Sequence, residues 1–424
     1  MEDNTWLVTA VLALSYLASG LNFSILSPLQ LTWAQSLGTD IYAFSSVFTW
    51  RSTGYVFGCI FGCVLFRYIN RQVCLAFMYL LIAITLSTAT MASDLSGIVI
   101  SLGLQGIFTG VCDAATSAIM CQVLKERAGP FLQVLYLSFG LGCTLAPLMA
   151  APLLDNFKTV LWMTSGLVLF SSISLLSLLC LVHEVRETDS QGNVTSTPFS
   201  WTAVLEWTKT NLRTVILVIL TSFIILFLSG MEITYWEFLP AYLQQVPFSV
   251  MVSGEKASYM TSAANYGFMM ARGVGIFLSA RISPLNIILF DLLLLGFSCL
   301  LLLINGSLFV LWFCNITIGV AFGTLYPQIY ALIAKEIMVT NYYSSLFAFC
   351  SGVTAALYPG LVSYQISRNH QFLVQLVLAN IIVAAILLGL FVLVVKHFGR
   401  NELVKSEDIV LEPHINSDNQ TTVV

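Results

Sequence analysis

The sequence predicts an all-α membrane protein whose twelve transmembrane helices form two pseudo-symmetric six-helix bundles. Three observations predict this fold: the composition, the number of long apolar runs, and a repeat between the two halves of the chain. Of the 424 residues, 58% are hydrophobic and only 9% are charged, whereas soluble domains carry about 25% charged residues. No basic cluster points to nucleic acid as a partner. We therefore expect the chain to lie in a lipid bilayer.

Twelve apolar runs are long enough to cross a bilayer, which takes about 20 residues. They cover residues 6–29, 43–66, 73–92, 97–121, 130–152, 159–182, 214–240, 258–280, 285–304, 308–332, 342–366 and 372–397. The acidic start, Met1 to Thr5, leads into the first run without a cleavage site of small residues, so we expect a retained helix rather than a signal peptide.

An even number of spans places both termini on one side of the membrane. Most of the 17 Lys and Arg residues lie in loops or ends on that side, which the positive-inside rule assigns to the cytoplasm. We expect a multi-pass protein of the plasma membrane. The longest internal loop is polar and separates six spans from six, which predicts an N-terminal bundle at 1–182, a cytoplasmic linker at 183–212, a C-terminal bundle at 213–398 and a disordered cytoplasmic tail at 399–424.

The two halves repeat each other in sequence. Four matches follow the same order in both: residues 19–24 with 229–234, 51–54 with 272–275, 125–126 with 335–336, and Gly140 with Pro147 against Gly352 with Pro359. Each match is short, but their common order indicates a duplicated six-helix unit in parallel orientation. Halves of this kind enclose a cavity near the middle of the membrane.

One acid, Asp113, lies inside the fourth span. A charged side chain near the bilayer centre costs on the order of 3 kcal/mol, so it normally faces a cavity or a partner. Residues three or four apart share a helix face, which places Gln105, Thr109, Asp113 and Thr116 on one polar stripe. The stripe can bind a solute or a coupling cation, with a sodium site or a proton at Asp113. The alternative is a structural acid paired with a neighbouring helix.

Two arginines, Arg51 and Arg272, also lie inside spans. At 1.5 Å per residue, Arg51 is about 12 Å and Asp113 about 24 Å from the same membrane boundary, a difference that a long guanidinium bridges in large part. We hypothesise that these two residues pair and form the cation-coupling site. Arg272 has Glu232 and Glu237 on the preceding span as candidate partners. For either arginine, the alternative is a clamp between helices.

Spans one and seven supply a second polar stripe, in which Ser19 and Asn22 of span one correspond to Ser229 and Glu232 of span seven. Amide and carboxylate groups hydrogen-bond hydroxyls, and an aromatic face such as Tyr235 or Trp236 suits the apolar face of a sugar ring. These features favour a polyol or a hexose, although they fit other neutral polar solutes. The two aromatic residues have packing as their alternative role. In span ten, Tyr326 is the best candidate for solute contact.

Family motifs appear in spans two, four and five. The end of span two has Gly62, Arg67 and Arg71 of the loop pattern G-x-L-x-D-R-x-G-R-R, with Phe66 in place of the acid. Together with the Arg-x-x-Gly of span two, Gly110-Val111-Cys112-Asp113, and the run Gly129 to Gly140 that continues to Ala146-Pro147-Leu148, it makes the sequence similar to the major facilitator superfamily. The branch that it resembles is the sodium-dependent glucose transporter-like one, also called the major facilitator superfamily domain-containing protein four family.

This resemblance implies that spans one, four, seven and ten line the cavity, which would bring Asn22, Asp113, Glu232 and Tyr326 around one pocket. It also implies a hexose as the solute. The predicted coupling residues are Asp113 and Arg51. The predicted solute-binding residues are Asn22, Gln105, Thr109, Gln133, Glu232, Tyr235, Trp236, Arg272 and Tyr326.

We expect a monomeric secondary transporter that moves a small neutral polar solute by alternating access, coupled to sodium or protons. Without a Walker motif no nucleotide drives it, and without a catalytic motif we expect neither an enzyme nor a cofactor. Two alternatives stay open. One is a facilitative uniporter of the same fold. The other is a transport-inactive sensor or scaffold, which is supported by Phe66 in place of the acid of the loop pattern.

Overall fold

The structure, a computed structural model, describes residues 2–65, 71–124, 128–181, 212–245, 251–304, 307–337, 341–366 and 368–410. Most of the predicted linker lies outside these residues, as does the end of the predicted tail. The described residues are almost entirely helical, as the sequence predicts.

The helices of the first half are α1 (Glu2–Ser24), α2 (Leu26–Ser36), α3 (Ile41–Leu65), α4 (Arg71–Met91), α5 (Leu95–Leu124), α6 (Ala128–Ala150), the short 3₁₀ segment η2 (Ala151–Asn156) and α7 (Phe157–Leu181). The helices of the second half are α9 (Leu212–Gln245), α10 (Gly254–Ser279), α11 (Pro284–Ile304), α12 (Leu308–Glu336), α13 (Asn341–Ile366) and α14 (Phe372–Val410). Each predicted span coincides with one of these helices, except that α1 and α2 together make the first. That span breaks after Ser24 because Pro28 has no N–H and its ring crowds the Ser24 carbonyl.

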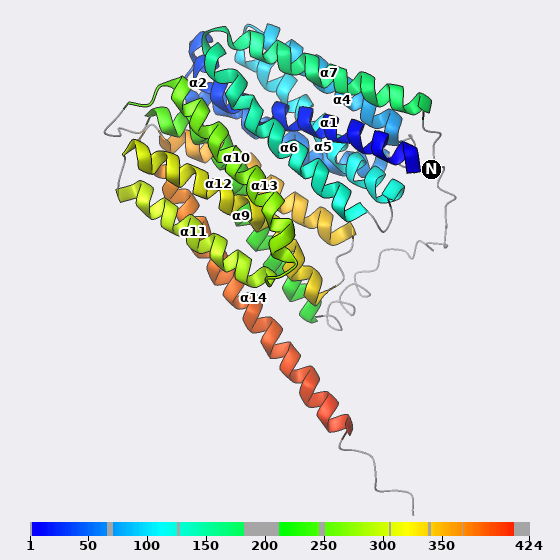
Figure 1. Cartoon of the computed structure of the whole chain (residues 1–424). Helices are drawn as coiled ribbons and strands as arrows, with labels where there is room; N and C mark the ends of the chain where they lie inside the picture. Colours follow the sequence, from blue (N-terminus) through cyan, green and yellow to red (C-terminus); the bar gives the residue numbers. More distant parts are fainter. Residues whose placement is uncertain are drawn as a thin grey trace, which may run out of the picture.

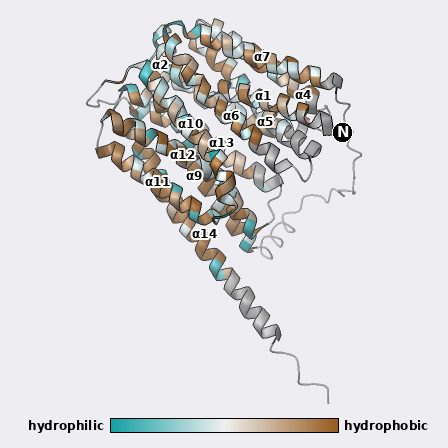
Figure 2. Ribbon diagram, in the orientation of Figure 1, coloured by the Kyte–Doolittle hydropathy of each residue, from teal (hydrophilic) through white to brown (hydrophobic). Residues whose placement is uncertain are grey.

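Among the described residues, nine helical stretches are long and apolar enough to cross a membrane. The helices α3 and α10, which carry Arg51 and Arg272, are not among them. Large apolar side chains such as Leu293 and Phe297 of α11 are more than half exposed, and Figure 2 shows the outer sides of α11 and α14 as mostly hydrophobic. Helices satisfy their backbone polar groups internally, which hydrocarbon requires. The described helices therefore suit a bilayer.

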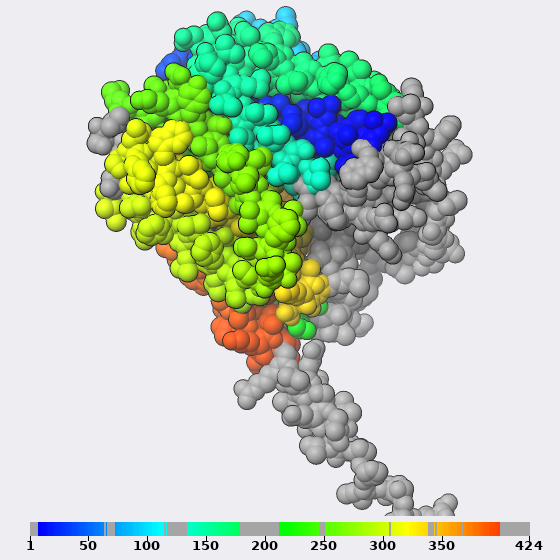
Figure 3. Space-filling view, viewed as in Figure 1, coloured from blue at the N-terminus to red at the C-terminus, as the bar shows by residue number. Residues whose placement is uncertain are grey.

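The two halves repeat the same helix packing. In the first half α3 packs on α5, α1 on α6, and α4 on both α5 and α7; in the second, α10 packs on α12, α9 on α13, and α11 on both α12 and α14. The contacts between halves are also paired, because α6 meets α10 and α3 meets α13. Figure 1 shows the two halves as separate groups of helices, and Figure 3 shows α6 and α10 in contact on the visible face. The repeat seen in the sequence is thus a repeat of structure.

We call the end of the molecule at which α1 begins and α14 finishes the terminal end, and the opposite one the distal end. In Figure 1 the halves lie close together at the distal end, near α2, and diverge toward the terminal end. Hydrogen bonds join the halves in the distal part of their helices. Three examples are Ser45 Oγ with Ser363 Oγ at 2.7 Å, Ser262 Oγ donating to the Thr144 carbonyl at 2.7 Å, and Gln30 Nε2 donating to the Glu237 carbonyl at 2.9 Å.

Inside each half, glycines let two helices touch backbone to backbone. A Cβ atom on Gly58 of α3 would overlap the carbonyl of Ile107 on α5, and one on Gly110 of α5 would overlap the carbonyl of Tyr55 on α3. Gly319 of α12 meets the carbonyl of Ala264 on α10 in the same way. Small residues at helix interfaces drive close packing in membranes. These contacts fix the depth of α3 relative to α5.

We predict that Gly58→Ala destabilises the protein, because its new methyl group has no space beside the Ile107 carbonyl. Overpacking of this kind costs about 1–3 kcal/mol. Thermal unfolding in detergent, followed by size-exclusion chromatography, should show a lower midpoint. Gly296→Ala is the matched control, since no atom lies within 4 Å of a Cβ placed there. Equal midpoints for the two variants would contradict the proposed packing.

Candidate functional site

A central cavity of about 270 Å³ lies between the two halves. Its lining comes from α1, α3, α5 and α6 of the first half and α9, α10, α12 and α13 of the second. Ligand pockets range from about 300 to 1,000 Å³, so this cavity suits a small solute. The predicted site residues that line it are Asn22, Arg51, Thr109, Asp113, Glu232, Trp236, Arg272 and Tyr326.

Asn22 and Gln105 form a buried amide pair between α1 and α5. Gln105 Nε2 donates to Asn22 Oδ1 at 3.0 Å, and Asn22 lies in the cavity wall while Gln105 lies behind it, fully buried. The other amide oxygen, Gln105 Oε1, has no partner among the described residues. Gln105 thus positions Asn22 and is itself outside the cavity lining.

Asp113 faces the cavity from α5, with Thr109 one turn before it. Its Oδ2 atom accepts a hydrogen bond from the Tyr55 hydroxyl at 2.9 Å. The hypothesis that Arg51 pairs with Asp113 is wrong in this structure. The glycine contacts fix the depth of α3, and they place Tyr55, one turn nearer the terminal end than Arg51, opposite the acid.

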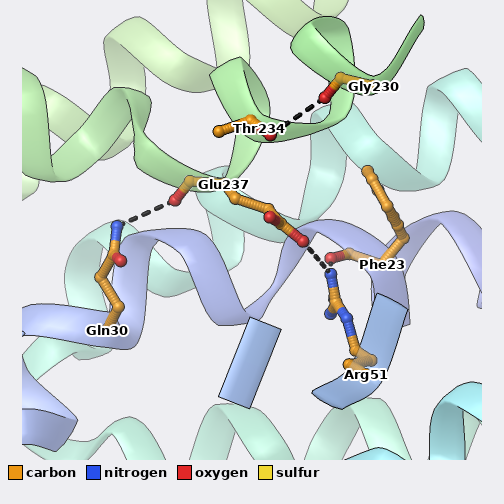
Figure 4. Close-up of polar contacts among 6 residues, drawn as sticks. All are labelled: Phe23, Gln30, Arg51, Gly230, Thr234 and Glu237. Carbon is orange, nitrogen blue, oxygen red and sulfur yellow. Dashed lines mark hydrogen bonds and ion pairs between the residues drawn. The ribbon is translucent and has the colours of Figure 1, made fainter. Parts of the chain in front are cut away.

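Arg51 instead binds Glu237 on α9, in the other half of the molecule. Arg51 Nη2 lies 3.0 Å from Glu237 Oε1, and Nη1 donates to the Phe23 carbonyl at 3.2 Å. Figure 4 shows this pair, together with Gln30, whose amide reaches the Glu237 carbonyl from α2. The Arg51 guanidinium also lies 5.3 Å from the centre of the Phe23 ring and 5.6 Å from that of Phe48. The arginine is therefore held on several sides.

Glu232 and Arg272 supply the opposite charges of the second half. Both residues line the cavity, and the Arg272 guanidinium lies 4.2 Å from the centre of the Phe268 ring. Its Nε atom is buried and has no hydrogen-bond partner among the described residues. The Trp236 ring packs edge-on against the Phe268 ring, with 5.5 Å between the ring centres and 73° between the ring planes. This corner of the cavity offers an aromatic face next to charged hydrogen-bonding groups.

The neighbouring aromatic residue, Tyr235, points elsewhere. It is fully buried, it is not part of the cavity lining, and its hydroxyl donates to Asn315 Oδ1 on α12 at 2.6 Å. Tyr326 does line the cavity, and its hydroxyl lies 3.3 Å from that of Tyr330. The predicted residue Gln133 belongs to α6, but its side chain lies outside the part that the structure describes.

Several polar residues of this region were not predicted as site residues, and three of them make the charged contacts or line the cavity. Tyr55 holds Asp113, Asn265 of α10 lines the cavity, and Glu237 binds Arg51. Tyr55 was within reach of sequence reasoning, because it follows Arg51 by four positions and so shares its helix face. The residue patterns of single segments do not reveal how one half docks on the other. This docking places Glu237 beside Arg51. Among the described residues, no three His, Cys, Asp or Glu side chains are grouped so that they could hold a metal ion.

We predict that Tyr235→Phe lowers stability, because Asn315 Oδ1 loses the Tyr235 hydroxyl. An unsatisfied buried polar group costs about 1–3 kcal/mol. Thermal unfolding in detergent should show the loss. Trp236→Phe is the comparison variant, because it changes a cavity-lining side chain and leaves the Asn315 bond in place. A stability loss confined to the Trp236 variant would contradict these assignments.

Comparison with known proteins agrees with this architecture. The sequence profile described as Major Facilitator Superfamily matches residues 12–359. The chain is 24% identical over 420 residues to sodium-dependent glucose transporter 1 of Danio rerio, covering 90% of this chain and 68% of that protein. It is 22% identical over 390 residues to the protein of that name from Xenopus laevis, covering 86% and 77%.

Among solved structures, the fold is similar to that of a mutant of the nucleoside transporter NupG. The TM-score is 0.67 at 18% sequence identity, and the similarity covers 91% of this chain and 98% of that chain. At this level of identity the likeness concerns the fold alone. The family profile spans most of the chain and the helix arrangement agrees with it, so this protein belongs to the Major Facilitator Superfamily.

Proposed function

We propose that this protein is a secondary active transporter that moves a small neutral polar solute, a hexose, together with one monovalent cation. The observation that carries the proposal is the charge balance of the central cavity. Arg51 is neutralised by Glu237, which lies outside the cavity lining. The remaining charged groups of the described lining are Asp113, Glu232 and Arg272, and they sum to a single negative charge.

One negative charge suits a sodium ion or a proton together with a neutral solute. Asp113 is the acid that takes the cation in this proposal, since Glu232 shares its half of the lining with the opposite charge of Arg272, while Asp113 has a neutral hydroxyl as its hydrogen-bond donor. A charge enclosed in a cavity without a partner is costly. Cation binding would remove that cost and so favour closing the cavity over Asp113 with the solute inside.

The solute class follows from the rest of the lining. The Asn22 amide, the Thr109 hydroxyl and the Arg272 guanidinium offer hydrogen bonds in several directions, while Trp236 and Phe268 offer apolar faces. Hexoses combine hydroxyl groups with apolar ring faces, which is the combination that such a wall accepts. The relatives named sodium-dependent glucose transporter 1 support the choice of hexose and sodium for this chain.

We further propose the plasma membrane as the location, with the terminal end toward the cytoplasm. The excess of Lys and Arg on that side supports this orientation. The distal end, which is closed by contacts between the halves, would then face outward. The conformation described here would accordingly be the one in which the cavity is closed to the outside.

The proposal predicts that hexose uptake into proteoliposomes depends on a cation gradient and that Asp113→Asn removes the dependence. Radiolabelled hexoses are offered with a sodium gradient, with a pH gradient, and with neither. We expect accumulation in the variant to fall by roughly tenfold, within the range typical of coupling between two binding sites.

Asp291→Asn serves as the matched control. Asp291 is also an acid inside a span, but it is buried between α11 and α12, accepts from Thr324 Oγ1 at 2.6 Å, and is absent from the cavity lining. Its variant should keep gradient-dependent uptake. Equal, gradient-independent uptake by the wild type and the Asp113 variant would identify a uniporter, and no hexose uptake by the wild type would refute the proposed solute.

A further inference from the structure

We propose that Arg51 and Glu237 form the latch of the distal end, in which Glu237 binds Arg51 while that end is closed and a monovalent cation while it is open. This inference rests on the alternating access proposed above, and it assigns a role to Glu237, which lies outside the cavity lining. It also identifies how a cation can act on the closed end.

The pair sits where the halves must separate. Arg51 belongs to α3 and Glu237 to α9, and their side chains are 9% and 2% exposed. Two further contacts cross at the same level: the Gln30 amide reaches the Glu237 carbonyl, and the rings of Phe48 and Phe238 lie 5.7 Å apart. Opening the distal end parts all three contacts. Of these, the ion pair is the one whose separation leaves charges behind.

The Glu237 carboxylate has few other partners once Arg51 moves away. Figure 4 shows its carboxylate directed at the guanidinium and away from Gln30, which bonds the main chain instead. Its second oxygen, Oε2, has no hydrogen-bond partner among the described residues. Among the described charged and titratable groups of α9 and of the helices packed against it, Arg51 is the one that faces the Glu237 carboxylate.

Removing one partner of a buried ion pair leaves an uncompensated charge, which is strongly destabilising. In the open state Glu237 therefore needs another positive partner, and water entering from the distal side can supply a sodium ion or a proton. The two buried arginines and the acids Asp113, Glu232 and Glu237 sum to one negative charge. With the distal end open, one cation next to Glu237 therefore balances the charge of the region.

The experiment follows opening directly, by labelling a cysteine placed at Ser45. Ser45 is 2% exposed and its hydroxyl bonds Ser363 across the closed distal end, so a membrane-impermeant maleimide can reach this position when the halves part. The purified full chain is reconstituted into vesicles without any solute. The Ser45→Cys protein is the parent for the variants below, and the chain without this cysteine gives the background from the native cysteines. Oxidative crosslinking of Ser45→Cys with Ser363→Cys tests whether these two positions are adjacent when the distal end is closed.

We expect Glu237→Gln to raise the labelling rate at least about tenfold, because a lost buried ion pair shifts the closed state toward the open one. The double variant Arg51→Gln with Glu237→Gln leaves no unpaired charge, so it should fold while also labelling fast. Exchanging the charges, as Arg51→Glu with Glu237→Arg, should slow labelling again. Glu336→Gln is the matched control: it breaks the 2.7 Å pair with Arg213 inside the second half, and it should label like the parent.

The cation step has its own readout. Replacing choline by sodium at equal ionic strength, or lowering the pH, should speed labelling of the parent and leave Glu237→Gln unchanged; whichever cation acts identifies the ligand. Unchanged labelling in Glu237→Gln and in the double neutral variant would overturn the latch, and a parent that responds to neither cation would overturn the exchange. Because labelling needs no solute, a failure of hexose uptake leaves this test intact.

Discussion

The placement of charge inside an apolar chain is the constraint on which this structure depends. Arg51, Asp113, Glu232, Glu237 and Arg272 all lie within membrane-spanning helices. Hydrocarbon offers such groups no partner, so each must turn toward the interior of the protein. The helices that carry them, α3, α5, α9 and α10, all line the cavity between the two halves or lie at its edge. The polar cavity and the charged contacts at its closed end are therefore products of one requirement.

Duplication supplies the frame, and divergence of a few side chains supplies the site. The two arginines occupy matching positions in α3 and α10, yet they have different surroundings. Arg51 reaches Glu237 across the boundary. The repeat aligns Glu237 with Ser27, so Arg272 finds no acid at the corresponding place in the first half. It lies over the rings of Phe268 in its own half and Tyr136 in the first half, and it shares the cavity wall with Glu232.

The fold could be predicted from sequence because hydropathy and the repeat are properties of single segments and their order. The site was predicted only as far as helix periodicity reaches. Tyr235 and Trp236 are adjacent, and the rotation that turns Trp236 to the cavity depends on Asn315 of another helix. Similarly, Asp113 was paired with the wrong residue because the relative depth of α3 and α5 comes from glycine contacts. The pairing of Glu237 with Arg51 could not be predicted either, because it depends on how the two halves dock.

The chemistry of the two kinds of helix interface explains which of them can move. Within each half, glycines such as Gly58 and Gly319 bring backbones into direct contact, and such packing has no alternative arrangement of similar energy. Between the halves at the distal end, the contacts include a hydroxyl pair, an amide hydrogen bond and an ion pair, whose groups water, together with a cation at Glu237, can satisfy after separation. Interfaces that open are in general more polar than permanent ones. The halves are therefore built to move as bodies, with the distal contacts as the ones that break and form again.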